Sequence, residues 1–146
     1  MRSPPGVSDA DFAAAIAAFE AAVGKDWVFT SQEDTDLYKD AYSPFWGEPE
    51  EKWVSAAVAP DTTEQVQAVM RIANQHRIPI YPISTGKNLG YGGSAPVLAG
   101  SVVLDLKRMN RVLEVDEKNA FALVEPGVSY FDLYRYISER GLKVWV

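Results

Sequence analysis

The chain has 146 residues, 47% of them hydrophobic, which is the size of one domain with enough apolar material for a packed core. Its net charge of −6 argues against a nucleic-acid-binding protein, because contact with phosphate backbones normally requires an excess or a cluster of basic residues. The absence of cysteine excludes disulfides, thiolate metal sites and cysteine nucleophiles.

The sequence also lacks the long apolar segments that membrane insertion and secretion require. No apolar run approaches the roughly 18 residues that can span a bilayer. The N-terminus leads into a predicted helix without the apolar core of a signal peptide. We therefore expect a cytoplasmic protein that does not insert into membranes, with the periplasm as the alternative location, and we predict no metal site.

Residues 1–53 are predicted to be a helical segment that aromatic side chains anchor. Ser8 followed by Asp11 is typical of a helix N-cap, and apolar residues then recur at helical spacing until Gly24. A short second helix is predicted near Gln32 to Tyr38. We interpret the stretch after the first helix as a surface segment held by its aromatic residues, which are Trp27, Phe29, Tyr38, Tyr42, Phe45 and Trp46.

The next stretch has the pattern of a β-α-β unit. A β-favouring run covers Val54 to Val58, and cap chemistry at Asp61 to Glu64 begins a helix that extends to Gln75. A second strand is predicted at Ile80 to Ile83. This order predicts parallel pairing of the two strands through a right-handed crossover. Ligands of such sheets bind at the carboxyl ends of the strands.

Three further strands and a helix are predicted after residue 100. The helix begins at a cap on Ser129, runs to Arg140 and ends at Gly141. Lys143 to Val146 reads as one more apolar strand, so we expect the domain to be incomplete. The three predicted strands are 101–106, 112–116 and 121–125, with a hairpin turn at 117–119 and an end at Pro126-Gly127.

A glycine-rich loop follows the strand at Ile80 to Ile83. Its glycines free the backbone to adopt positive φ and to approach a ligand closely. Consecutive backbone N–H groups in such a turn can bind an anion such as a phosphate. Tyr91 lies between two glycines, which favours a functional role for its phenol, although a tight connection between strands stays the alternative for the loop. The loop glycines are Gly86, Gly90, Gly92 and Gly93.

Two common nucleotide motifs do not fit this loop. The phosphate-binding P-loop needs a glycine five residues before Gly86-Lys87 and a serine or threonine after the lysine, but Tyr81 and Asn88 occupy these positions. The dinucleotide fingerprint matches only in letters, because Pro96 stands where its helix should be running. The interpretation that remains for the loop is a glycine-rich, anion-binding turn of another type.

Four segments together resemble one family, the vanillyl-alcohol oxidase and p-cresol methylhydroxylase (PCMH) flavoenzymes, and within it the branch that oxidises 4-alkylphenols. The likeness covers residues 55–146. It implies an α+β fold: residues 54–146 would be the first half of a PCMH-type FAD-binding domain, with a small parallel βαβ subdomain and part of a mixed sheet with flanking helices. The second half and the substrate domain would be absent. The segments that carry the resemblance are 84–93, 100–105, 109–115 and 122–130.

The resemblance also implies roles for single residues. Tyr91 matches the tyrosine that helps to bind the phenolate oxygen of the substrate, and Pro126-Gly127 matches a turn near the cofactor. The diphosphate of FAD would be bound by backbone amides and side chains of Ser84, Thr85, Gly86, Lys87, Asn88, Leu89 and Gly90.

The chemistry that the resemblance implies is hydride abstraction from the para side chain of a 4-alkylphenol, through a quinone methide. The expected electron acceptor is a cytochrome or oxygen, the complete enzyme is expected to be a homo-oligomer, and the chain by itself is expected to be inactive. Two alternatives stay open. One is an FAD-linked oxidase or dehydrogenase of a lactone or a 2-hydroxy acid, and the other is a nucleotide-binding module without catalysis.

Overall fold

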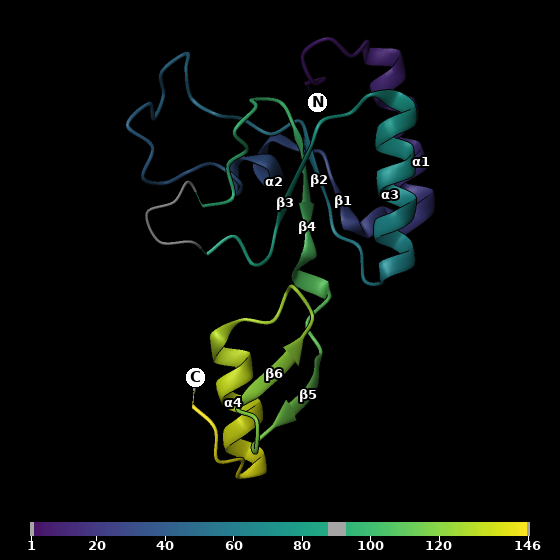
Figure 1. Cartoon of the computed structure of the whole chain (residues 1–146). Helices are drawn as coiled ribbons and strands as arrows, with labels where there is room; N and C mark the ends of the chain where they lie inside the picture. The colour runs from purple at the N-terminus through teal and green to yellow at the C-terminus, as the bar shows by residue number, and fades with distance from the viewer. Residues whose placement is uncertain (1, 88–92, 146) are drawn as a thin grey trace.

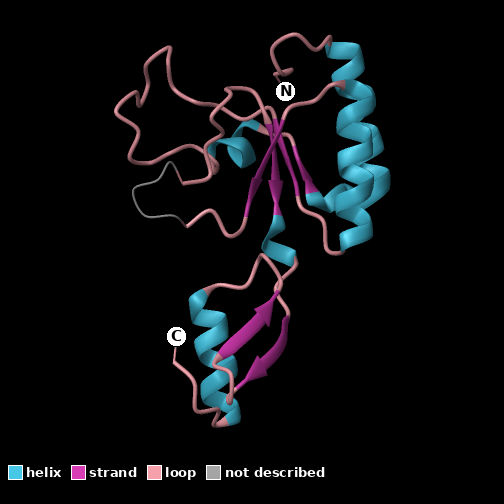
Figure 2. Cartoon of the chain, viewed as in Figure 1, coloured by secondary structure: helices cyan, strands magenta, loops and turns pink. Residues whose placement is uncertain are grey.

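The computed structural model describes residues 2–87 and 93–145, which form two units connected by a narrow neck (Figure 1). The larger unit holds a four-stranded sheet, and the smaller one holds a two-stranded hairpin and a helix (Figure 2). In chain order the elements are α1 (Asp9–Val23), β1 (Val28–Phe29), α2 (Gln32–Asp36), β2 (Ala56–Val58), α3 (Thr63–His76), β3 (Ile80–Ile83), β4 (Val102–Asp105), β5 (Val112–Asp116), β6 (Phe121–Val124) and α4 (Tyr130–Arg140), with short 3-10 turns at Lys25–Trp27 and Leu106–Arg108.

The strand order in the sheet is β1-β2-β4-β3, with β1 antiparallel and the other three strands parallel. The predicted direct pairing of the β-α-β strands is therefore wrong, because β4 lies between β2 and β3. Two features explain this order. All four residues of β4 are buried, which suits a central strand, whereas Pro82 in β3 has no N–H to donate and favours an edge.

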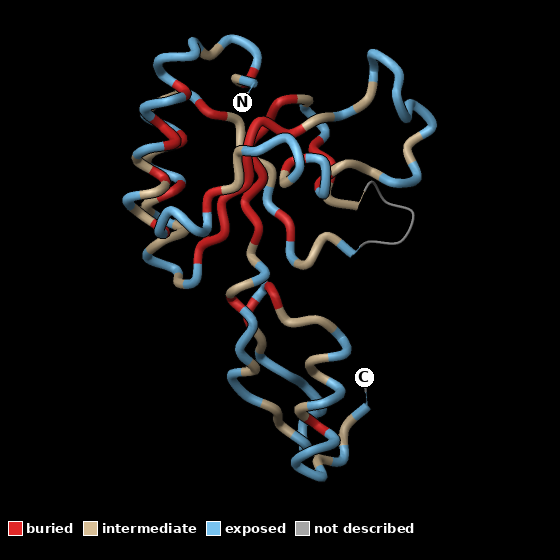
Figure 3. Tube along the Cα trace, turned by 180° about the vertical axis from the view of Figure 1, so that it is seen from behind, coloured by how far each residue is buried: buried red, intermediate tan, exposed pale blue. Residues whose placement is uncertain are grey.

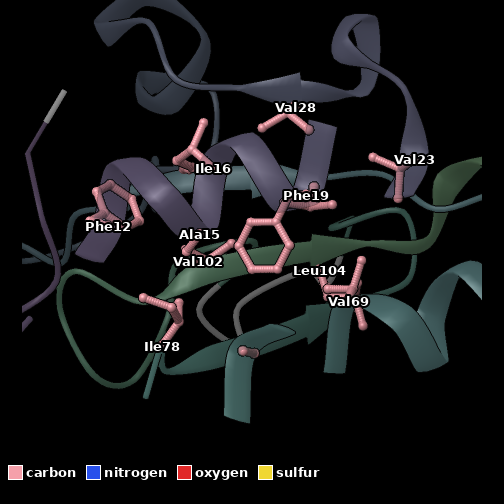
Figure 4. Close-up of a cluster of buried hydrophobic side chains, with 13 residues drawn as sticks. Phe12, Ala15, Ile16, Phe19, Val23, Val28, Val69, Ile78, Val102 and Leu104 are labelled. Atoms are coloured by element: carbon pink, nitrogen blue, oxygen red, sulfur yellow. The ribbon is translucent and has the colours of Figure 1, made fainter. Parts of the chain in front are cut away.

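Helices α1 and α3 cover one face of the sheet and form the main core (Figure 1). Strand residues alternate between the two faces, so that Val102 and Leu104 point toward these helices while Val103 points away. Phe19 lies among α1 and sheet residues in the middle of this cluster and is fully buried (Figure 4). The N-terminal helix thus shares one core with the strands that follow residue 53.

The helix ends agree with the sequence predictions. The Ser8 hydroxyl accepts a hydrogen bond from the Asp11 backbone N–H at 3.1 Å, which satisfies one free donor of α1. At α4, Ser129 and Asp132 form the two reciprocal bonds of a capping box. Gly141 ends α4 with a φ of 64°, a left-handed conformation that glycine adopts without strain.

The aromatic residues of the N-terminal segment differ in their burial. Tyr38 is buried against the second face of the sheet, in a cluster with Val54, Ala57, Ile83 and Val103. By contrast, the loop after α2 carries its aromatic residues outward, since Tyr42, Phe45 and Trp46 are exposed.

The smaller unit consists of the β5–β6 hairpin and α4, and most of its surface is exposed (Figure 3). Its exposed apolar side chains include Phe121 and Leu123 of β6 and Tyr130 and Phe131 of α4. The predicted strand at 143–146 is wrong for residues 143–145, which have no strand partner. The Lys143 backbone N–H donates instead to the Glu117 carboxylate at 2.5 Å.

Candidate functional site

The glycine-rich loop leaves the sheet at the carboxyl end of β3. Ile83, the last residue of β3, pairs in register with Asp105 at the end of β4, so the loop begins beside two parallel strand ends. Ligands of parallel sheets bind at this kind of edge. The described part of the loop therefore starts at the sheet edge where the sequence predicted it, and its role as a ligand site stays a prediction.

Gly86 is a position where the loop needs glycine. Its φ is +66°, and a Cβ added there would lie 2.1 Å from the Ser94 hydroxyl oxygen. That hydroxyl donates to the Gly86 carbonyl at 3.3 Å, which brings the two ends of the described loop together. The two segments can approach each other this closely only because Gly86 has no side chain.

Ser84 connects the loop to the smaller unit. Its hydroxyl donates a short hydrogen bond to the carbonyl of Pro126, which is 42 residues away in the chain. The proton of the Ser84 hydroxyl is therefore used within the protein.

Gly127 allows the neck between the two units to close. A Cβ at this residue would lie 2.3 Å from the Leu106 carbonyl oxygen and 2.8 Å from that of Met109. Its own N–H donates to the Met109 carbonyl at 2.8 Å. These contacts give Gly127 a packing role, and its predicted contact with a cofactor stays a prediction.

A buried carboxylate joins the two strands of the hairpin at the neck. Glu125 is 8% exposed and accepts from the Arg111 backbone N–H at 2.8 Å and from Nε at 2.9 Å. The guanidinium Nη2 lies 2.5 Å from Glu125 Oε1. The hydrogen bonds from the Arg111 side chain, followed by the one from its backbone, lower the pKa of Glu125 below its ordinary value of 4.5.

This lowered pKa predicts that acid destabilises the neck. A carboxyl group whose pKa is lower in the folded state contributes stability above its unfolded pKa and loses it as the pH falls through the folded pKa. The thermal unfolding midpoint should therefore fall more steeply below about pH 4.5 in the wild type than in Glu125→Gln. Circular dichroism melts across this range measure the difference.

Glu114→Gln is the matched control, since Glu114 is an exposed glutamate on the same hairpin. Equal acid sensitivity of the wild type and Glu125→Gln would contradict the role assigned to the Arg111–Glu125 pair.

A pocket of about 380 Å³ lies between the glycine-rich loop and the N-terminus of α4. Its size is within the range of about 300–1,000 Å³ that small-molecule sites occupy. Its walls come from β3, the loop and the turn that begins α4, so both units contribute. The lining residues are Tyr81, Pro82, Ile83, Ser84, Thr85, Gly86, Lys87, Gly93, Val128, Ser129, Tyr130 and Phe131.

The electrostatics of this pocket favour an anion. Lys87 supplies a cation, and the positive end of the α4 helix dipole is partly offset by the carboxylate that caps it. The Asp132 carboxylate caps that helix end, and hydrogen bonds from Ser129 lower its pKa, with smaller contributions from the positive charges of Arg135 and Lys87. Tyr81, Tyr130 and Phe131 add aromatic surface, so the pocket suits a ligand with both an anionic and a planar part.

The structure brings together four of the predicted cofactor residues and leaves others untested. Ser84, Thr85, Gly86 and Lys87 line the pocket. Pro126 and Gly127 lie at the neck beside it, where Pro126 accepts the hydrogen bond from Ser84. The remaining predicted site residues lie outside the described part of the chain: they are Asn88, Leu89, Gly90 and Tyr91.

The sequence analysis missed the wall that α4 contributes. The helix start at Ser129 was predicted, but the position of residues 128–131 opposite the loop depends on a fold across the neck.

In the described residues 2–87 and 93–145 no helix is long and apolar enough to cross a membrane, and no group of acidic or histidine side chains could hold a metal ion.

The residues present fit the diphosphate and aromatic parts of FAD. Gly86 lets the backbone of the turn close tightly at the pocket, Lys87 supplies a positive charge, and aromatic side chains line the rest. When bound, FAD supplies the acceptor for one hydride, which carries two electrons.

Comparison with known proteins supports the same ligand. Residues 54–146 match the family described as "FAD binding domain". The flavoprotein subunit of 4-cresol dehydrogenase (hydroxylating) from Pseudomonas putida is 44% identical over 97% of this chain, which covers 27% of that protein. The chain spans about a quarter of the length of such relatives.

Two solved structures have the same fold. The crystal structure of p-cresol methylhydroxylase with substrate bound superimposes with a TM-score of 0.93 and 43% identity, over 99% of this chain and 28% of that chain. The 4-ethylphenol oxidase from Gulosibacter chungangensis, in complex with isoeugenol, gives a TM-score of 0.92 and 43% identity over the same shares. The predicted PCMH-type α+β fold and FAD as cofactor are thereby confirmed. The chain belongs to the FAD binding domain family and is similar to the flavoprotein subunit of 4-cresol dehydrogenase and to p-cresol methylhydroxylase.

Proposed function

We propose that this chain is the FAD-binding part of an oxidoreductase that removes a hydride from the para side chain of a 4-alkylphenol. The observation that carries the proposal is the pocket between Ser84–Lys87 and the N-terminus of α4, which combines the positive charge of Lys87 with aromatic walls. Relatives that act on cresol and ethylphenol, matched over nearly the whole chain, support the choice of substrate class.

The residues of this chain would bind and orient the cofactor. Lys87 neutralises diphosphate charge, and the backbone amides of the loop donate to phosphate oxygens. Ser84 would act indirectly. Its hydroxyl donates to the Pro126 carbonyl and so fixes the loop against the smaller unit. Asn88 to Gly90 would continue the diphosphate contacts.

The proposed reaction needs a deprotonated phenol. Loss of the phenolic proton lets the ring push electrons toward the para position. The C–H bond on the side-chain carbon attached there then breaks, the hydrogen leaves with the electron pair as a hydride for which bound FAD would be the acceptor, and a quinone methide remains. Tyr91 would donate a hydrogen bond to the phenolate oxygen and so lower the pKa of the substrate. A cytochrome or oxygen would then take the electrons. We further propose that the complete enzyme is a homo-oligomer and is located in the cytoplasm.

Anaerobic mixing of the complete FAD-loaded protein with 4-cresol tests the proposal. We expect the flavin absorbance to bleach with 4-cresol and to stay unchanged with glycolate or a sugar lactone. Bleaching by glycolate or a lactone and not by a 4-alkylphenol would show that the substrate is a 2-hydroxy acid or a lactone. A protein that binds FAD and ADP but bleaches with none of them would be a nucleotide-binding module.

Tyr91→Phe separates the role of the phenol from that of the loop. Removing one donor from a developing oxyanion typically costs about 10²–10³-fold in rate, so bleaching by 4-cresol should slow on that order while FAD binding is retained. Tyr134→Phe, on the exposed side of α4, is the control and should bleach like the wild type. A rate unchanged in Tyr91→Phe would remove Tyr91 from the substrate site.

A further inference from the structure

We propose that Tyr38 and Asp105 form a buried positioning pair that fixes the segment after α2 against the carboxyl edge of the sheet and thereby holds Gly86 and Lys87 in place for the cofactor. The inference rests on the proposed function only for its ligand. The positioning itself follows from the contacts of Tyr38 and Asp105, which no step of the proposed reaction uses.

The pair is isolated from water and well satisfied. Tyr38 is 7% exposed and Asp105 is 4% exposed. The Tyr38 hydroxyl donates to Asp105 Oδ2 at 2.8 Å across 67 residues of chain. The Lys107 backbone N–H donates to Oδ1 at 3.1 Å, and Lys107 Nζ lies 3.0 Å from Oδ2. A buried carboxylate persists only with such partners.

The location of Asp105 brings the pair to the site. Asp105 ends β4 and pairs in register with Ile83, directly before Ser84. Ile83 and Tyr38 belong to the same buried cluster on the second face of the sheet. Tyr38 therefore connects α2 to the point where the glycine-rich loop leaves the sheet.

The segment around Tyr38 forms a second wall for the loop. A pocket of about 250 Å³ separates residues 37 and 39–42 from Gly86, Lys87, Gly93 and Ser94. Gly86, Lys87 and Gly93 line both hollows, with α4 on one side and the Tyr38 segment on the other. Lys39 and Asp40 line the second hollow on the side opposite Lys87, and they reach this position only if Tyr38 stays bound to the sheet.

The Tyr38 phenol stays protonated throughout the physiological range. Burial, and then the negative charge of Asp105 and the hydrogen bond to it, raise the pKa of Tyr38 far above its ordinary value. Tyr38 thus keeps its proton for the hydrogen bond to Asp105, as a positioning contact requires.

Tyr38→Phe tests the pair because it removes a single oxygen. We expect the folded chain to bind FAD about tenfold more weakly, the effect of losing one buried hydrogen bond to a charged group. The backbone order parameters of Gly86 and Lys87, measured by nitrogen-15 relaxation on the free chain, should fall toward the mobile range below about 0.6, while those of α1 and α3 stay near 0.85. Asp105→Asn should produce the same pattern more weakly, because the amide oxygen still accepts from Tyr38 but loses the charge.

The control is Tyr134→Phe, which makes the same chemical change on an exposed tyrosine of α4 and should alter neither quantity. Order parameters of Gly86 and Lys87 that match the wild type in Tyr38→Phe would overturn the inference. A uniform fall that includes α1 and α3 would also overturn it, since the pair would then serve global stability alone. A complete protein that binds no FAD although the loop of the wild-type chain is ordered would refute the proposed function and would not affect the positioning pair.

Discussion

Phe19→Ala is expected to lower the free energy of unfolding by about 3–5 kcal/mol, the usual cost of deleting a fully buried phenylalanine. Phe19 has no exposed surface and lies in the cluster that joins α1 to α3 and the central strand β4 (Figure 4). Because a domain of this size is stable by only about 5–15 kcal/mol, one such cavity removes a large part of the total. Urea unfolding followed by circular dichroism measures the loss.

Phe131→Ala is the matched control, because Phe131 also lies on a helix but is 79% exposed. Its substitution should change the unfolding free energy by less than about 0.5 kcal/mol. If the two variants were equally stable, α1 would not be part of the core that supports the sheet, and the packing of the N-terminal helix against β4 would be wrong.

Gly86→Ala should distort the cofactor loop and weaken FAD binding by more than tenfold. The left-handed backbone costs an alanine about 1–2 kcal/mol. The Cβ would lie 2.1 Å from the Ser94 hydroxyl oxygen and 3.3 Å from Ile83 Cδ1, and overpacking of this kind costs about 1–3 kcal/mol more. FAD titration followed by flavin fluorescence measures the loss of affinity, and thermal melts measure the loss of stability.

A second substitution separates the two causes. Gly86→Ala combined with Ser94→Gly removes the overlap with Ser94 and leaves the backbone strain, so part of the affinity should return. Gly47→Ala carries the backbone cost alone, since Gly47 has a φ of +77° and no atom within 4 Å of an added Cβ, and it should not affect FAD binding. An FAD affinity of Gly86→Ala equal to that of the wild type would show that the loop is not the diphosphate site.

Structural features that depend on near neighbours were predicted correctly. The N-cap hydrogen bonds of α1 and α4 each join two residues that are three positions apart, Ser8 with Asp11 and Ser129 with Asp132. The hairpin β5–β6 also formed where alternating apolar residues flank a short turn. Local hydrogen bonds and the spacing of apolar residues depend on only a few adjacent residues, so they can be recognised without knowledge of the fold.

Features that join distant segments were missed or were wrong. The predicted strand at 143–146 failed because a strand needs a neighbour, and residues 143–145 have none in the described chain. The loop aromatics Tyr42, Phe45 and Trp46 look like Tyr38 in composition, yet only Tyr38 meets a buried acceptor. Their burial depends on what folds against them, which composition does not specify.

The sequence alone determined the position of the helices and strands, the glycine turn after β3 and, through the likeness to flavoenzymes, the cofactor. The tertiary structure decided that β4 lies between β2 and β3, that Pro126 binds Ser84, and that Asp105 binds Tyr38. These contacts span 42 and 67 residues, and each exists only because the sheet and the neck bring both partners to one edge. The assembly of the pocket walls therefore depends on long-range packing, whereas the glycine turn and the helix start at Ser129 can each be recognised from a few adjacent residues.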